Sequence, residues 1–248
     1  MMITSQSQAP LQAMPQAIPQ AIPQDIRRIG FATTNPHKCQ ETQAILNRLM
    51  APLTVEVVPI ETAQTVEETG QTFLANAQLK LAAALSHPAA PLPEDLTLLM
   101  AEDSGLVVPS LAGTSGLSPF PGIYSDRWLN DETLARRLLG DCPHEPLTYS
   151  HKCQALLRLL DGVADRRASY QAAIAAVTLP EQHCIEAHGH LPLVVAHQAS
   201  GQGGFGYDPI MAPADRPGQT LASLPADVKN ACSHRHMALA NLVQQWQR

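Results

Sequence analysis

Short apolar runs alternate with helix-like segments in the first half of the chain. Residues 29–33 and 54–60 have the length and patterning of strands, and residues 96–101 form an unbroken apolar run typical of a buried strand. A helical pattern begins at Pro36, behind a good N-cap residue, and Thr72 is positioned to cap a second helix that runs to about Leu85. The first unit is therefore a strand, a short polar turn and a helix.

The second half has a different pattern. Two helices are expected at residues 131–139, capped by Asp131, and at about 149–160. Residues 166–179 then show the clearest strand alternation in the chain, and residues 183–190 and 193–197 predict two more strands. Strands that follow one another so closely predict a partly antiparallel lobe. A last helix begins after Ser233 and carries an apolar stripe that ends at Trp246.

Residues 1–25 do not share these patterns. Proline recurs at every fourth position near their end, in Met-Pro and Ile-Pro steps up to Pro23. Proline removes helix hydrogen bonds and is excluded from sheet interiors, so the segment is expected to be a disordered tail rich in Pro and Gln. We expect residues 26–248 to form the folded domain, in two lobes.

The composition excludes several classes of function. The chain has 248 residues, 45% of them apolar, and a net charge of -6 with a pI near 5.9. A net negative charge without a stripe of basic residues argues against nucleic-acid binding. No apolar run approaches 18 residues, so no membrane association is expected, and the N-terminus lacks the features of a secretory signal. Five scattered cysteines without close pairing indicate reduced thiols and a cytoplasmic protein.

The first candidate for chemistry follows the buried strand at residues 96–101. Glu102 and Asp103 come directly after its apolar residues, and Ser104 and Gly105 follow them. Open α/β sheets bind ligands at such strand ends, and Asp103 is a candidate to hold a metal and activate water. The competing interpretation is an acidic turn in which Asp103 accepts backbone hydrogen bonds.

The turn before the first helix is the second candidate. A helix N-terminus presents a partial positive charge, and Lys38 adds a full charge one turn into the helix. Thr33, Asn35 and Lys38 are therefore a candidate cradle for a triphosphate, although the glycines of a Walker loop are missing. An ordinary capped helix with a solvated lysine is the alternative.

Three further segments carry polar or aromatic groups suited to a nucleotide. Glu68, close to a helix N-terminus, is either a magnesium ligand or a residue that favours the helix dipole. Phe205 lies among four glycines and is either a stacking platform for a base or a core residue. Lys229, His234 and Arg235 surround the start of the last helix and could donate to phosphate or to a base.

Taken together, six segments in order along residues 28–246 closely resemble the inosine triphosphate pyrophosphatase family, also described as XTP/dITP diphosphatases. They are residues 32–38, 67–73 with 76–77, 103–105, 121–125, 204–209 and 233–235. The resemblance implies an α/β fold: an elongated protein of two lobes, with a mixed central sheet flanked by helices and a cleft between the lobes. It also implies a homodimer that uses Mg²⁺.

The activity implied by the resemblance is hydrolysis of non-standard purine nucleoside triphosphates, such as ITP, dITP and XTP, to the monophosphate and pyrophosphate. Asp103 would be the catalytic residue, and Glu68 and Asp103 would hold the metal. The substrate-binding residues would be Thr33, Thr34, Asn35, Lys38, Ser104, Phe205, Gly206, Tyr207, Asp208, Lys229, Ser233, His234 and Arg235.

The chain also departs from the family pattern. Glu102 stands where the acidic pair usually begins with Asp, and its extra methylene could shift the geometry at a metal. Further departures are a longer loop before Pro121, Leu191 in place of an aromatic residue, Ser223 in place of Glu and His236 in place of Gly. They motivate a second hypothesis, a nucleotide-binding regulatory protein with weakened catalysis.

Overall fold

The computed structural model describes residues 26–130, 132–140 and 147–247. These residues form one six-stranded sheet in the order β2-β1-β3-β4-β5-β6. The strands are β1 (Ile26–Ala32), β2 (Thr54–Pro59), β3 (Leu96–Val107), β4 (Arg167–Thr178), β5 (Cys184–Val195) and β6 (Met211–Pro213). The β1 strand runs parallel to β2 and β3, whereas the β3-β4, β4-β5 and β5-β6 pairs are antiparallel. The predicted mixed sheet of an α/β fold is confirmed.

Six α-helices lie in the described part of the chain. They are α1 (Pro36–Leu49), α2 (Phe73–Ser86), α3 (Glu132–Leu139), α4 (Tyr149–Leu159), α5 (Ala226–Cys232) and α6 (His234–Trp246). Three predicted caps are confirmed by side-chain hydrogen bonds: Asn35 on α1, Thr72 on α2 and Ser233 on α6. The predicted cap Asp131 and the predicted tail, residues 1–25, lie outside the described residues. None of the helices in the described ranges is long and apolar enough to cross a membrane.

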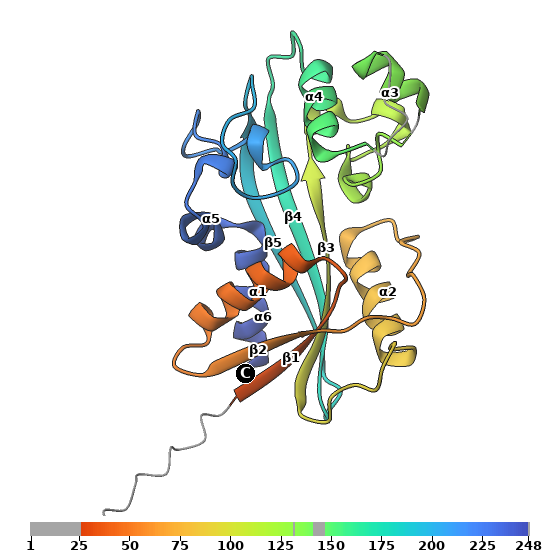
Figure 1. Cartoon of the computed structure of the whole chain (residues 1–248), viewed down its shortest axis with the longest axis vertical. Helices are drawn as coiled ribbons and strands as arrows, with labels where there is room; N and C mark the ends of the chain where they lie inside the picture. Colours follow the sequence, from red (N-terminus) through yellow and green to blue (C-terminus); the bar gives the residue numbers. More distant parts are fainter. Residues whose placement is uncertain (1–25, 131, 141–146, 248) are drawn as a thin grey trace, which may run out of the picture.

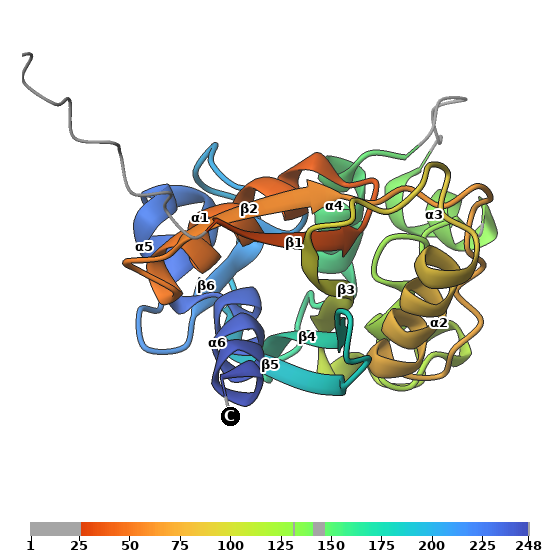
Figure 2. The same ribbon diagram turned by 90° about the horizontal axis from the view of Figure 1, so that it is seen from below.

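The helices cover the sheet in two lobes (Figures 1 and 2). In one lobe α2 packs on one face of the sheet, against Leu99 and Ala175, and α1 and α6 pack on the other face, against Met100 and Ile174. In the other lobe α3 and α4 pack against the later part of β3 and the start of β4. The molecule is elongated along the direction of β3 and β4, which pass through both lobes.

Two strand boundaries were predicted wrongly. The predicted strands at residues 183–190 and 193–197 are one strand, β5, because β4 offers a continuous antiparallel partner from Arg167 to Val177. The strand that begins at Leu96 does not end before the carboxylates but continues through Glu102 and Asp103 to Val107, and β4 pairs with it from Leu98 to Val107. The acidic pair therefore lies in the middle of a strand.

The end of β1 leaves the edge of β3 uncovered beside those carboxylates. The last residue of β1 in the ladder, Ala32, pairs with Ala101, whereas β3 continues for six more residues. The turn that follows β1, at Thr33 to Asn35, consequently opens beside Glu102 and Asp103. This difference in strand length is what creates room for a site inside the sheet.

A close crossing of α6 over β5 positions the other side of that site. A Cβ atom on Gly189 would lie 1.9 Å from the carbonyl oxygen of His234 and 2.5 Å from the backbone nitrogen of Ala238. Only glycine allows the helix backbone to approach the strand this closely. The contact holds the first turn of α6, and with it His234 and Arg235, against the sheet.

Candidate active site

A cavity of about 540 Å³ lies where β1 ends and the two lobes meet. Every substrate-binding, catalytic and metal-binding residue predicted from the sequence lines it: Thr33, Thr34, Asn35, Lys38, Glu68, Asp103, Ser104, Phe205, Gly206, Tyr207, Asp208, Lys229, Ser233, His234 and Arg235. The structure also brings to the cavity several residues that the sequence reasoning did not select, among them Glu41, Lys80, Arg127 and Tyr149.

The Asp103 carboxylate faces α2. Lys80 Nζ lies 2.9 Å from Asp103 Oδ1 and 2.6 Å from Glu68 Oε1, so one ammonium joins both carboxylates. The amide of Asn76 donates to Asp103 Oδ2 at 3.0 Å, and Arg127 pairs with Glu68 at 2.8 Å. Burial alone would raise the pKa of Glu68, but Lys80 and Arg127 outweigh it and lower that pKa.

Two carboxylates that converge on one cation can also hold a metal. Asp103 and Glu68 both lie within 3 Å of the Lys80 ammonium. No cluster of three or more His, Cys, Asp or Glu side chains suited to a metal occurs among the described residues. An oxygen-only set of two carboxylates is unsuited to zinc but fits Mg²⁺, which commonly takes one or two carboxylates and completes its shell with water and phosphate oxygens.

Glu102 faces the opposite side of the sheet, toward α1 and α6, because neighbouring residues of a strand alternate. Arg235 donates to both of its oxygens, from Nε at 2.7 Å and from Nη2 at 2.8 Å, and Lys38 Nζ lies 3.3 Å away. Burial would raise the pKa of Glu102, but Arg235 and Lys38 hold it well below its usual range. Burial lowers the pKa of Lys38, and Glu102 opposes that effect.

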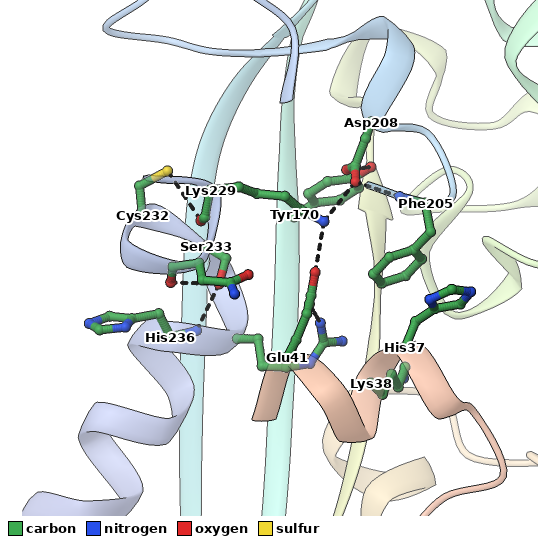
Figure 3. A network of polar contacts seen from close by, with 12 residues as sticks. His37, Lys38, Glu41, Tyr170, Phe205, Asp208, Lys229, Cys232, Ser233 and His236 are labelled. Carbon is green, nitrogen blue, oxygen red and sulfur yellow. Dashed lines mark hydrogen bonds and ion pairs between the residues drawn. The ribbon is translucent and has the colours of Figure 1, made fainter. Parts of the chain in front are cut away.

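From Arg235 a chain of charged groups continues around the cavity, and Figure 3 shows its part from Glu41 through Lys229 to Asp208. Arg235 also pairs with Glu41, a residue of α1. Glu41 in turn pairs with Lys229 at 2.7 Å, and Lys229 pairs with Asp208 at 2.8 Å. Carboxylates and cations thus alternate from Arg235 to Asp208, and Asp208 accepts from the neutral hydroxyl of Tyr170 on β4 at 3.2 Å.

This chain changes the interpretation of the predicted donor cluster. Lys229 and Arg235 are not free donors, because each contacts two carboxylates, and Arg235 is only 1% exposed. The sequence reasoning missed Glu41, although it lies three residues after Lys38 and so on the same side of the helix. That spacing was the available signal. Likewise Lys80 shares a helix face with Asn76, four residues earlier.

His234 is the exception in the donor cluster. Its Nδ1 is buried and has no hydrogen-bond partner among the described residues. Desolvation, with the nearby charge of Arg235, lowers its pKa to about 3, so the ring is neutral at physiological pH. The ring tilts against Tyr170 with 4.9 Å between centroids. A buried, unpaired ring nitrogen beside a cavity is a group that a ligand can satisfy.

The start of α1 is more fully paired than the sequence suggested. The side-chain oxygen of Asn35 accepts from the backbone nitrogens of His37 and Lys38, at 3.0 and 3.2 Å. Those two backbone donors are therefore already used. The groups that remain for an anion are the Asn35 amide, the hydroxyls of Thr33 and Thr34, the helix dipole and the Lys38 ammonium.

Phe205 lies at the cavity wall, partly exposed, and not in the core. His37 stacks on it with ring centroids 5.6 Å apart and an interplanar angle of 13°, and Lys229 Nζ lies 4.6 Å from its centroid (Figure 3). The loop wraps tightly around Asp208: a Cβ atom on Gly204, whose φ is +71°, would lie 2.1 Å from Asp208 Oδ2. Asp208 also accepts from the backbone nitrogen of Phe205 at 2.9 Å.

Tyr207 supports the wall from behind. Its hydroxyl donates to the carbonyl oxygen of Ser125 at 2.5 Å and accepts from Trp128 Nε1 at 2.7 Å. The residue is only 3% exposed, and its polar end is used inside the protein. Tyr207 therefore shapes the pocket by packing.

Comparison with known proteins identifies the group to which this site belongs. The sequence profile of the Ham1 family matches residues 29–245. The chain belongs to the Ham1 family. The matched region runs from β1 to α6, so it includes every element that lines the cavity, and it excludes the predicted tail.

Relatives within the Ham1 family share about a third of their residues with this chain. A protein of Symbiobacterium thermophilum named dITP/XTP pyrophosphatase is 34% identical over 221 residues, covering 88% of this chain and 94% of that protein. One of Aquifex aeolicus with the same name is 34% identical over 212 residues, covering 86% and 93%.

Solved structures agree with the family assignment. The HAM1 protein of Coxiella burnetii is similar with a TM-score of 0.63 and 28% identity, covering 89% of this chain and 98% of that one. A nucleoside-triphosphatase, or dITP/XTP pyrophosphatase, of Mycobacterium abscessus has a TM-score of 0.59 and 30% identity, covering 87% and 98%. The elongated, two-lobed mixed sheet is thus a Ham1 fold.

Proposed function

We propose that this Ham1 family protein hydrolyses non-standard purine nucleoside triphosphates, such as dITP, XTP and ITP, to the monophosphate and pyrophosphate. The observation that carries the proposal is a single cavity that combines three features. These are the capped start of α1 with Lys38, the carboxylates of Asp103 and Glu68 around one cation, and the aromatic ring of Phe205. The names of the relatives support the same reaction.

The triphosphate is assigned to the lobe of α1. Asn35, Thr33 and Thr34 offer hydroxyl and amide donors there, and Lys38 and Lys80 offer ammonium groups on the two faces of β3. Cations that are already positioned by neighbouring carboxylates stabilise developing phosphate charge without reorganising during the reaction. Ser104 follows Asp103 on β3 and also lines the cavity.

Asp103 is assigned the role of general base. Its carboxylate is oriented by Asn76 and Lys80 and can accept a proton from the attacking water. Glu68 and Asp103 are the residues assigned to Mg²⁺. When bound there, Mg²⁺ supplies charge neutralisation on the phosphate oxygens and makes water more acidic.

Recognition of the base is assigned to Phe205 and His234. In the tautomer that carries its proton on the unpartnered Nδ1, neutral His234 can donate to the 6-keto oxygen of hypoxanthine or xanthine. The 6-amino group of adenine is itself a donor and would leave that N–H unpaired, which disfavours ATP. Arg235 acts behind this contact, since its guanidinium is held by Glu102 and Glu41.

The test is product identification with purified protein. Wild-type protein incubated with ITP and Mg²⁺ is expected to release IMP and pyrophosphate, with faster turnover for ITP, dITP and XTP than for GTP and ATP, and with none after chelation by EDTA. Release of orthophosphate in place of pyrophosphate would contradict the assigned bond, and equal rates for ITP and ATP would contradict the assigned base contact.

A regulatory nucleotide-binding protein with weakened catalysis is the competing hypothesis, motivated by Glu102. The carboxylate of Glu102 faces away from Asp103 and binds Arg235 and Lys38, so its extra methylene does not enter the carboxylate pair assigned to the metal. Turnover of ITP above about 1 s⁻¹ would exclude this hypothesis. Tight binding of ITP without turnover would support it.

The assembly and location of the protein are also proposed. We propose a cytoplasmic homodimer, in which the described cysteines Cys39, Cys153, Cys184 and Cys232 stay reduced. Leu79 and Leu85 of α2, 38% and 42% exposed, are apolar residues that a partner could cover. Sedimentation equilibrium of the full chain tests the proposed dimer.

A further inference from the structure

Tyr149 lines the cavity but has no role in the proposal above. It is the first residue of α4 and therefore belongs to the lobe opposite α1. Its ring packs over the loop that carries Phe205, since a Cβ atom on Gly206 would lie 3.6 Å from Tyr149 Cε1. The residue is 37% exposed, so a large part of its surface is available to a ligand.

The ring of Tyr149 is held in place by its neighbours. Lys152 Nζ lies 4.4 Å from the ring centroid, and Tyr207 meets the ring edge to face at 5.3 Å and 89°. Lys152, itself only 5% exposed, is fixed by the Asp126 carboxylate at 2.8 Å and by the Asp126 carbonyl oxygen. An aromatic ring held this firmly loses little conformational entropy when it binds a planar ligand.

Phe205 alone offers an incomplete platform for a base. His37 stacks on its ring and Lys229 lies over the ring at 4.6 Å, so much of its flat surface is already in contact with protein. Lys229 is tied to Glu41 and Asp208, which leaves it little freedom to move aside. Lys152 also lies over the Tyr149 ring, but Tyr149 is 37% exposed and, next to Gly206, offers a second aromatic surface at this end of the cavity.

We infer that Tyr149 is a second aromatic wall of the nucleobase subsite, and that Lys152 and Asp126 position it. The inference rests on the proposed function, because it assumes that a purine nucleotide enters the cavity with its base toward Phe205. It assigns to α4 a binding role that is separate from the triphosphate and carboxylate groups at the other end of the cavity.

The chain contains a matched control. Tyr124 is 38% exposed and lies under a cation, with Arg127 Cζ 4.9 Å from its ring centroid, but it does not line the cavity. Tyr149→Ala and Tyr124→Ala remove the same side chain from positions of similar exposure. Only the first removes a surface that the inference places against the base.

The experiment measures KM and kcat for ITP and the inhibition constant of tripolyphosphate, which has no base. Because stacking of a base on an aromatic ring contributes substantially to affinity, Tyr149→Ala is expected to raise KM for ITP about tenfold. The kcat value and the tripolyphosphate constant are expected to change less than about twofold, and Tyr149→Phe is expected to restore the KM of the wild type. Tyr124→Ala, which touches Arg127 but not the base end of the cavity, is expected to change the KM for ITP less than about twofold.

Three results would overturn the inference: an unchanged KM for ITP in Tyr149→Ala, an equal loss of tripolyphosphate inhibition, or no rescue by Tyr149→Phe. The proposed function is judged separately, by turnover of the wild type. If the wild type binds ITP without turnover, the dissociation constants of ITP for Tyr149→Ala and for the wild type are compared in place of the KM values. Their ratio then decides the inference alone. A wild type that does not bind ITP at all overturns both.

Discussion

The two carboxylates in the middle of β3 are neighbours in sequence, but they point to opposite faces of the sheet. Glu102 points to the α1 and α6 face, where Arg235 binds it through two hydrogen bonds and Lys38 adds a third contact. Asp103 points to the α2 face, where Lys80 links it to Glu68. Glu102 is 3% exposed and Asp103 6%, so burial does not distinguish them.

What distinguishes them is the accessibility of their partners. Arg235 is 1% exposed and Glu41 behind it is also largely covered, so the Glu102 network is closed except at Lys38, whose side chain is 16% exposed. The side chains of Glu68 and Arg127, in contrast, are 25% and 35% exposed. A closed network of buried charges maintains geometry, whereas an open one can exchange a protein cation for a metal or a phosphate. The comparison therefore assigns structure to Glu102 and chemistry to Asp103.

Replacement of Asp103 by Asn should have the largest effect, on catalysis. The substitution removes the proposed proton acceptor while Lys80 keeps Glu68 as its partner at 2.6 Å. Turnover of ITP is expected to fall by about 10³-fold, and the free energy of unfolding by roughly 1–2 kcal/mol, because a buried contact is weakened while the Lys80 cation keeps a second carboxylate. Pyrophosphate release and urea denaturation measure the two effects. A folded variant with turnover near that of the wild type would refute the assignment of the base.

Replacement of Glu102 by Gln should act mainly on stability. It leaves Arg235 with Glu41 as its remaining carboxylate and removes the ion pair of Lys38 at 3.3 Å. The free energy of unfolding at pH 7 is expected to fall by about 3 kcal/mol, because breaking a buried ion pair leaves a buried charge without its partner. Urea denaturation at pH 7 measures the change, with Asp103→Asn as the matched variant.

The loss of stability in Glu102→Gln is predicted to depend on pH. The pKa of Glu102 is lower in the folded protein than its ordinary value of 4.5, so its contribution is present above pH 4.5 and is lost as the pH falls below it. The stability difference between wild type and Glu102→Gln should therefore shrink below about pH 4.5. If Asp103→Asn destabilises the protein more than Glu102→Gln, the comparison between the two faces is wrong.

His234 should produce the smallest effect, on the pH dependence of stability. Its pKa falls from 6.5 to about 3 on folding, so the unfolded chain takes up the proton first and stability declines as the pH drops below about 6.5. Between pH 7 and pH 5 the wild type is expected to lose about 1–2 kcal/mol more of its free energy of unfolding than His234→Gln. Thermal or urea denaturation at the two pH values measures this difference. Parallel losses in both proteins would show that His234 is not held neutral by the fold.

Local sequence rules predicted the helix caps correctly, because each cap side chain bonds to backbone groups only two or three residues further along the chain. Asn35, Thr72 and Ser233 were predicted as caps from the residues around them, and each accepts the expected backbone hydrogen bonds. The extent of β3 was predicted wrongly, since Glu102 and Asp103 look like the end of a strand when read alone. They continue the strand because β4 pairs with them from a distance of about seventy residues along the chain.

By itself, the sequence determined the kinds of chemistry that this protein can bring together. It determined the capped start of the first helix, the carboxylates, the aromatic loop and their order along the chain, because these depend on local residue types and spacing. Only the tertiary structure decided which carboxylate meets which cation. That choice depends on the alternation of side chains across β3 and on the packing of α2, α1 and α6 on its two faces, contacts between residues remote in sequence. It also decided that Lys229 and Arg235 are paired and not free, and that Tyr149 joins Phe205 at one end of the cavity.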